Sequence, residues 1–151
     1  MACLCGFPVW VRGIGEQVSP VTLPALRSLV VCWDQYSLPT ELVYGRVERS
    51  LTSSAVASNI CDLFSGGKRN PELFVNDLEG AAAQIHPEVL ALKSRLIEEG
   101  AIGALMTGSG AAVFGMWPDV RSASGAAVRL REHGLWAELV ELLAVSPAAA
   151  R

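Results

Sequence analysis

The sequence lacks the features that mark nucleic-acid-binding and membrane proteins. Its 151 residues carry a formal net charge of −3, and its longest basic run is the pair Lys68-Arg69. A protein that binds nucleic acid or an anionic membrane by charge needs a concentrated basic surface. No apolar run reaches the roughly 18 to 20 residues of a membrane span. We therefore expect neither nucleic acid nor a membrane as a partner.

The cysteines match no common metal or redox spacing. The cysteines are Cys3, Cys5, Cys32 and Cys61, with no C-x-x-C pair and no histidine at zinc spacing. Reduced thiols are typical of cytoplasmic proteins. The N-terminus also lacks the basic segment and clean apolar core of a signal peptide. The sequence predicts a cytoplasmic protein without a metal site.

The stretch that does stand out runs from residue 100 to 117. Two short apolar runs, Ala104–Thr107 and Ala111–Trp117, flank Gly108-Ser109-Gly110. This pattern predicts a β-hairpin, and the glycines leave the backbone of its turn uncovered. No lysine follows the glycines as in a Walker loop, and the spacing is not Gly-x-Gly-x-x-Gly. The spacing alone is equally compatible with a plain tight turn and with a ligand-binding loop.

Strands and helices alternate along the rest of the chain. Hydrophobic periodicity and helix-end signals place the elements in the following order. They are a strand–turn–strand before residue 18, a buried strand at 29–33, helices at 40–47, 50–64, 76–83 and 87–99, a flexible loop at 65–71, the hairpin at 104–117, a helix at 118–132, and a strand or helix at 136–145. This order predicts an α+β fold with helices on one face of a sheet.

Most polar residues have simple structural interpretations when each is taken alone. Thr40 is expected as a helix N-cap, and Asn76–Glu79 as a helix start. His86 and His133 are expected as caps at helix ends, and Tyr44 as a packing residue. Four acids are expected on solvated faces, namely Glu98, Glu99, Glu138 and Glu141. Nothing assembles a nucleophile, a base and an oxyanion hole.

Several modest motifs, taken in order, form a specific series. They are Arg12–Glu16, the strand that ends near Trp33, Ser37–Tyr44, Asn76-Asp77-Leu78-Glu79, Pro87-Glu88-Val89, Leu92-Lys93, Gly100-Ala101 and Met106–Gly115. The series resembles the 4-diphosphocytidyl-2-C-methyl-D-erythritol kinases of the galactokinase, homoserine kinase and mevalonate kinase superfamily. The resemblance covers nearly the whole chain but only the C-terminal half of a family member.

The resemblance implies a fold, a reaction and a set of site residues. The fold is the superfamily's C-terminal domain, a ferredoxin-like α+β sandwich over 25–151, with 1–24 as a remnant of the N-terminal kinase domain. Family members use ATP and Mg²⁺ to phosphorylate the 2-hydroxyl of a CDP-linked methylerythritol in non-mevalonate isoprenoid biosynthesis. Tyr44 matches the aromatic residue that stacks on cytosine, and Thr40 lies near it. Thr107, Gly108, Ser109 and Gly110 match the loop that closes over the phosphoryl-transfer site.

The family's catalytic lysine, catalytic aspartate and ATP phosphate loop have no counterpart in this sequence. Counting back from Gly13–Glu16 puts the family's catalytic aspartate just upstream of Met1, and Cys5–Trp10 departs from the family's small-residue pattern. The resemblance therefore implies the C-terminal part of a kinase that is inactive unless the missing N-terminal half completes it. Two alternatives remain: a non-catalytic module that binds CDP-type ligands or a protein, and a degenerate fragment without a function.

Overall fold

The computed structural model describes residues 9–20, 28–47 and 75–141. The expected helix at 50–64, the loop at 65–71 and residues 142–145 lie outside these ranges. The elements in chain order are β1 (Val9–Arg12), β2 (Gln17–Pro20), β3 (Ser28–Trp33), α1 (Thr40–Tyr44), α3 (Glu79–Ile85), α4 (Glu88–Glu98), β4 (Gly103–Met106), β5 (Val113–Trp117), α5 (Val120–Glu132) and β6 (Trp136–Glu141).

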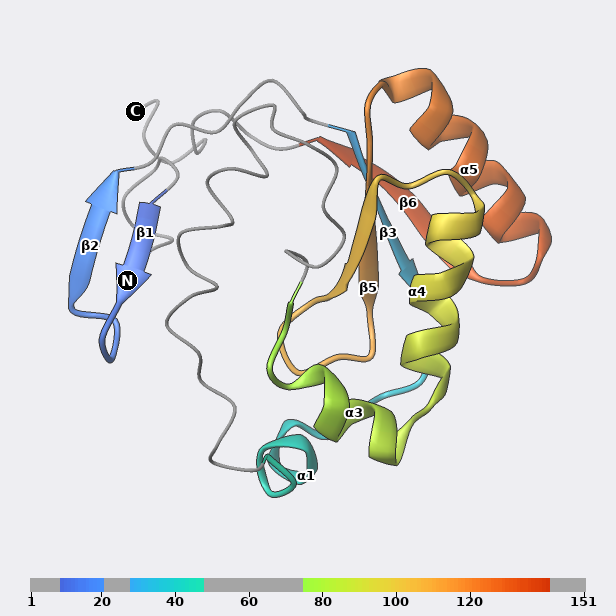
Figure 1. The fold of residues 1–151 in the computed structure, drawn as a ribbon. Coiled ribbons are helices and arrows are strands. Elements are labelled where there is room, and N and C mark those ends of the chain that lie inside the picture. Colours follow the sequence, from blue (N-terminus) through green and yellow to red (C-terminus); the bar gives the residue numbers. More distant parts are fainter. Residues whose placement is uncertain (1–8, 21–27, 48–74, 142–151) are drawn as a thin grey trace, which may run out of the picture.

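Strands β1 and β2 form a separate two-stranded antiparallel sheet, which lies to one side of the main sheet (Figure 1). The turn between them contains Gly13 and Gly15, both with positive φ. The Ile14 N–H donates to Glu16 Oε2 over 2.7 Å. The predicted strand–turn–strand is confirmed.

The main sheet has four strands in the order β4-β5-β3-β6, and every neighbouring pair is antiparallel. The connection from β3 to β4 contains α1, α3 and α4, and α5 connects β5 to β6. This is the β-α-β-β-α-β arrangement of a ferredoxin-like sandwich. The predicted α+β fold class is confirmed.

Helices α4 and α5 both pack on the same face of the sheet (Figure 1). Along β3, Val30 and Cys32 are buried while Leu29, Val31 and Trp33 are half-buried. Residues alternate between the two faces of a strand, so only every second residue faces the helices. The expectation of a continuously buried strand at 29–33 is wrong in this respect.

The core lies between the sheet and the two helices. Helix α4 buries Val89, Leu92 and Leu96, whereas α5 buries three alanines and Leu130. Alanines let α5 approach the strands closely. Burial of each large aliphatic side chain contributes about 1.5 to 3 kcal/mol to folding. The strand residues that complete the core are Val30, Cys32, Ala104, Met106, Val113, Trp117 and Ala137.

Several helix ends follow the local signals in the sequence. Asp119 caps α5, because its Oδ1 accepts a hydrogen bond from the Ser122 N–H over 2.9 Å. Gly100 and Gly134, with φ of 96° and 81°, follow the ends of α4 and α5. The ambiguous segment after Gly134 is a strand, paired with β3 from Trp136 to Glu141. In the described ranges no helix is long and apolar enough to cross a membrane.

Candidate functional site

The turn between β4 and β5 is a tight hydrogen-bonded loop. The Thr107 N–H donates to Ala112 O and the Gly110 N–H donates to Thr107 O, each over 2.9 Å. Gly108 has φ of 51° and Gly110 has φ of 90°, values that most side chains disfavour. The predicted hairpin is confirmed, and two of its glycines are explained by backbone conformation.

The two glycines differ in their surroundings. A Cβ at Gly110 would lie 2.8 Å from Met106 Sδ and 3.1 Å from Leu38 Cδ2. A Cβ at Gly108 would have no atom within 4 Å. Gly110 is therefore packed against the core, while Gly108 leaves open space beside the backbone. A ligand could approach the main chain at Gly108.

Thr40 brings a second predicted site segment to this turn. Its Oγ1 lies 2.9 Å from Ser109 Oγ, although the two residues are 69 positions apart. The expectation that Thr40 caps α1 is wrong, because the N-cap is Pro39 and no side chain caps the helix. The carbonyl of Pro39 accepts from the Leu42 N–H instead. The Thr40 hydroxyl is left to contact the turn.

Tyr44 is at the C-terminal end of the same short helix. Its side chain is 61 % exposed, while its neighbour Val43 is fully buried and anchors α1 to the core. The interpretation of Tyr44 as a packing residue is therefore wrong. An exposed aromatic ring one turn from Thr40 is available to stack on a ligand.

Asn76, which precedes α3, also contacts the glycine turn. Its Nδ2 donates to Met106 O over 2.9 Å and to Gly108 O over 2.8 Å. Its Oδ1 accepts from the Leu78 N–H over 3.0 Å just before α3. A helix does follow Asn76, but the expected cap there is wrong, because α3 begins at Glu79 with Leu78 as its N-cap and no side chain caps it. The contact of Asn76 with the turn was missed in the sequence.

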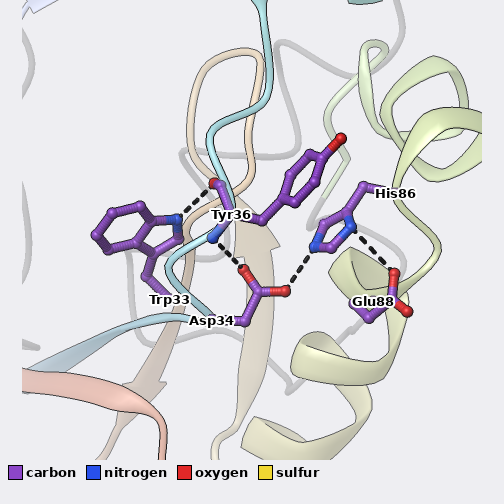
Figure 2. Close-up of polar contacts among 5 residues, drawn as sticks. All are labelled: Trp33, Asp34, Tyr36, His86 and Glu88. Carbon is purple, nitrogen blue, oxygen red and sulfur yellow. Dashed lines mark hydrogen bonds and ion pairs between the residues drawn. The ribbon is translucent and has the colours of Figure 1, made fainter.

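A histidine cluster secures the loop that leads from β3 to α1 (Figure 2). His86 Nε2 lies 2.5 Å from Asp34 Oδ2, and His86 Nδ1 lies 3.0 Å from Glu88 Oε2. The Tyr36 ring stacks on the His86 ring at a centroid distance of 4.0 Å. Trp33 Nε1 donates to Tyr36 O over 2.8 Å. The cluster attaches the loop before Thr40 to the corner between α3 and α4.

Both histidines do follow helices as expected, because His86 and His133 are the C-cap residues of α3 and α5. The side-chain role of His86 was missed, since its partner Asp34 is 52 residues away. An acidic residue next to a strand end and a histidine before Pro87 are the only signals for it. They are too common to identify a pair.

Other motif residues join the helices to each other. Lys93 Nζ lies 2.5 Å from Glu79 Oε1, which ties α4 to α3. Glu99 is not on a solvated face as expected, because its side chain is only 12 % exposed and it accepts from Arg129 Nε over 2.5 Å. Glu98 is exposed as expected. The first ion pair joins α4 to α3, and the second joins the C-terminal end of α4 to α5.

The turn leaves two backbone donors without a partner in the part of the chain that the structure describes. Within the described residues, neither the Gly108 nor the Ser109 N–H donates to the protein, and no atom would lie within 4 Å of a Cβ at Gly108. The hydroxyl of Ser109 has Thr40 as its neighbour rather than a basic group. Over 9–20, 28–47 and 75–141, no group of three or more His, Cys, Asp or Glu side chains is placed to hold a metal ion.

Comparison with known proteins gives a consistent picture. Residues 63–135 match the family described as GHMP kinases C terminal. A 4-diphosphocytidyl-2-C-methyl-D-erythritol kinase from Thermus thermophilus is 34 % identical over 128 residues, covering 83 % of this chain and 46 % of that protein. A kinase with the same name from Gloeobacter violaceus is 36 % identical over 150 residues, covering 88 % and 47 %. The chain spans about half the length of these relatives.

Solved structures agree. The crystal structure of a 4-(cytidine 5'-diphospho)-2C-methyl-D-erythritol kinase aligns with a TM-score of 0.77 and 32 % identity, over 91 % of this chain and 50 % of that one. A homoserine kinase from Cytophaga hutchinsonii aligns with a TM-score of 0.72 at 17 % identity, over 97 % and 51 %, and shares the fold. The chain is therefore a homologue of the 4-diphosphocytidyl-2-C-methyl-D-erythritol kinases and belongs to the GHMP kinase family, whose C-terminal domain it carries.

Proposed function

We propose that this chain is the C-terminal part of an ATP-dependent kinase that phosphorylates the 2-hydroxyl of 4-diphosphocytidyl-2-C-methyl-D-erythritol in non-mevalonate isoprenoid biosynthesis. The observation that carries the proposal is the hydrogen bond between Thr40 and Ser109. It unites the helix that would bind cytidine with the turn that would face the transferred phosphate. In the same proposal, residues 1–24 belong to the N-terminal kinase domain and 25–151 to the C-terminal domain, in the cytoplasm.

Each site residue has a separate task in this proposal. Tyr44 stacks on the cytosine ring and Thr40 lies beside the bound nucleotide. In the Thr107–Gly110 turn, the Gly108 and Ser109 N–H groups face the phosphate, because the Thr107 and Gly110 N–H groups donate within the turn. Phosphoryl transfer depends on such positioning and on charge neutralisation. As the resemblance to the family implies, the catalytic lysine, the catalytic aspartate and the ATP phosphate loop would belong to the N-terminal half of the complete enzyme.

Cytidine recognition is tested by titration calorimetry with CDP. Stacking of a base on an aromatic side chain contributes about 1 to 3 kcal/mol. Tyr44→Ala should therefore weaken CDP binding by roughly fivefold to 150-fold. Tyr44→Phe is the matched control and should bind nearly as well as the unaltered chain, since it keeps the ring. Equal affinity for CDP in the unaltered chain and Tyr44→Ala would refute the assignment of Tyr44.

A second candidate function is a non-catalytic module that binds CDP-type ligands. The observation that favours it is that the exposed Tyr44 ring and the open backbone at Gly108 are groups that could bind a nucleotide without any catalytic residue. Co-expression with the N-terminal half of the Thermus thermophilus relative separates the two candidates. Transfer of ³²P from ATP to the CDP-linked substrate by the pair, and its loss in the pair with Ser109→Trp, would support the kinase. CDP binding without transfer in a pair that forms a stable complex would support the module.

A further inference from the structure

Asn76 makes three hydrogen bonds with one side-chain amide. The two donated bonds reach the carbonyls of Met106 and Gly108, which flank Thr107 in the glycine turn. The accepted bond comes from the Leu78 N–H. Asn76 is half-buried, and the amide thus links the start of α3 to the end of β4. Three of the four hydrogen-bonding positions of an Asn side chain are used here.

The contacts set the path of the turn backbone. Met106 is the last residue of β4, and Gly108 is the exposed glycine with open space beside it. Holding the carbonyl oxygens on both sides of Thr107 fixes the peptide planes of which they are part. The Gly110 N–H bond to Thr107 O then closes the turn. Replacing Asn76 would remove the side-chain hydrogen bond that restrains the Gly108 carbonyl.

We propose that Asn76 is a positioning residue that holds the Thr107–Gly110 turn in the conformation that receives a phosphate group. This inference rests on the proposed function of the turn. Asn76 acts through the backbone of Met106 and Gly108 and does not itself contact the ligand. Its amide is needed as a donor toward the turn and as an acceptor toward α3.

Asn76→Asp separates these two tasks. A carboxylate of the same shape still accepts from the Leu78 N–H, and a negative charge at the start of a helix is favourable. It cannot donate to the two carbonyls and instead repels them. Asn76→Ser is a second variant, because its hydroxyl can accept from Leu78 but is too short to reach both carbonyls. Asp77→Asn, at the exposed neighbouring position, is the matched control.

The first measurement is amide hydrogen exchange by NMR in the full chain. In Asn76→Asp and Asn76→Ser, exchange of the hydrogen-bonded Thr107 and Gly110 amides should rise about tenfold or more, as expected for losing hydrogen bonds. The Ala82 and His86 amides of α3 should keep their protection. Asp77→Asn should change neither group. Unchanged exchange of the turn amides in both Asn76 variants would overturn the positioning role.

The second measurement is a titration with inorganic pyrophosphate, followed through the backbone amide signals of Gly108, Ser109 and Gly110. We expect saturable shifts in the unaltered chain and in Asp77→Asn, and affinity at least tenfold weaker in both Asn76 variants. If the turn amides exchange faster in the Asn76 variants but pyrophosphate still binds with undiminished affinity, the link between turn geometry and phosphate binding would be overturned. No shifts in the unaltered chain would instead refute the phosphate-binding function of the turn, while the exchange data still decide the positioning role.

Discussion

Asp34 Oδ2 and His86 Nε2 lie 2.5 Å apart, and this contact fastens the loop after β3 to the residue that follows α3. Asn76, just before α3, holds the glycine turn in the same way. The two ends of a seven-residue helix therefore hold two different segments of the candidate site. Helix α3 acts as a brace that sets the distance between the loop leading to Thr40 and the turn containing Ser109.

The pairing of Asp34 with His86 can be measured with a double-mutant cycle. His86→Phe keeps the stacking on Tyr36 but removes the polar contact, and Asp34→Asn removes the charge. Because both side chains are largely buried, we expect a coupling energy of about 1 to 3 kcal/mol in denaturant unfolding. The equivalent cycle on Arg95 and the exposed Glu98 is the control, with a coupling near zero. A coupling for Asp34 and His86 as small as the control would contradict the brace.

Gly110→Ala and Gly108→Ala should have different consequences. At Gly110 the methyl group would collide with Met106 and Leu38 at a positive φ, so we expect unfolding free energy to fall by roughly 2 kcal/mol or more. At Gly108 the space is open and the loss should be about 1 kcal/mol. Gly108→Ala should nevertheless weaken pyrophosphate binding, because its methyl group covers the backbone. Equal losses of unfolding free energy in the two variants would contradict the conclusion that Gly110 is packed and Gly108 is open.

Asp119 gives a prediction for pH dependence. The hydrogen bonds from the Ser122 backbone and hydroxyl hold the pKa of the Asp119 carboxyl below its ordinary value of 3.8. Because this pKa is lower in the folded state than in the unfolded state, the ionised carboxylate stabilises the fold at pH values above the unfolded-state pKa. This stabilisation is lost as pH falls through the folded-state pKa. The unaltered chain should melt above Asp119→Ala at neutral pH, and this difference should shrink on acidification to about pH 2. A difference independent of pH would exclude the carboxylate as the cap.

Cys32 should resist alkylation in the folded protein. Burial raises the pKa of the Cys32 thiol to about 11, and it outweighs the opposing hydrogen bond from the Trp33 backbone, while the charge of Asp34 adds a smaller increase. At pH 8 only about one thiol in a thousand would be ionised. Iodoacetamide labelling with peptide mapping should leave Cys32 unmodified until denaturant is added. Labelling at the denatured rate without denaturant would contradict the buried position.

The elements with local signals were predicted well from the sequence. Asp119 caps the helix it precedes, and Gly100 ends the helix before it, as the pattern indicated. The β4–β5 hairpin was found because its glycines interrupt two apolar runs. The one-sided burial of β3 could not be found this way. Apolar residues occupy both faces of that strand, and the position of α4 and α5 alone decides which face is buried.

The site itself was predicted only in part, because its contacts join distant positions. Local rules make Thr40 a reasonable cap, but Ser109 competes for the same hydroxyl from 69 residues away. Asn76 satisfies its local rule with the Leu78 N–H, and its amide protons are left for partners about 30 residues on. No periodicity carries information on such pairs. Resemblance to a family located these motifs, and the structure supplies the physical reason for each.

The register between β3 and the edge strand β6 brings the two ends of the sandwich together. Ser28 at the beginning of β3 is directly opposite Glu141 at the end of β6. The first and last described residues of the sandwich are therefore neighbours in adjacent strands (Figure 1). A unit whose two ends meet can be inserted into another protein, or circularly permuted with a short connector, without breaking its sheet. The pairing of Ser28 with Glu141 supplies the closeness of ends that domain insertion and circular permutation require.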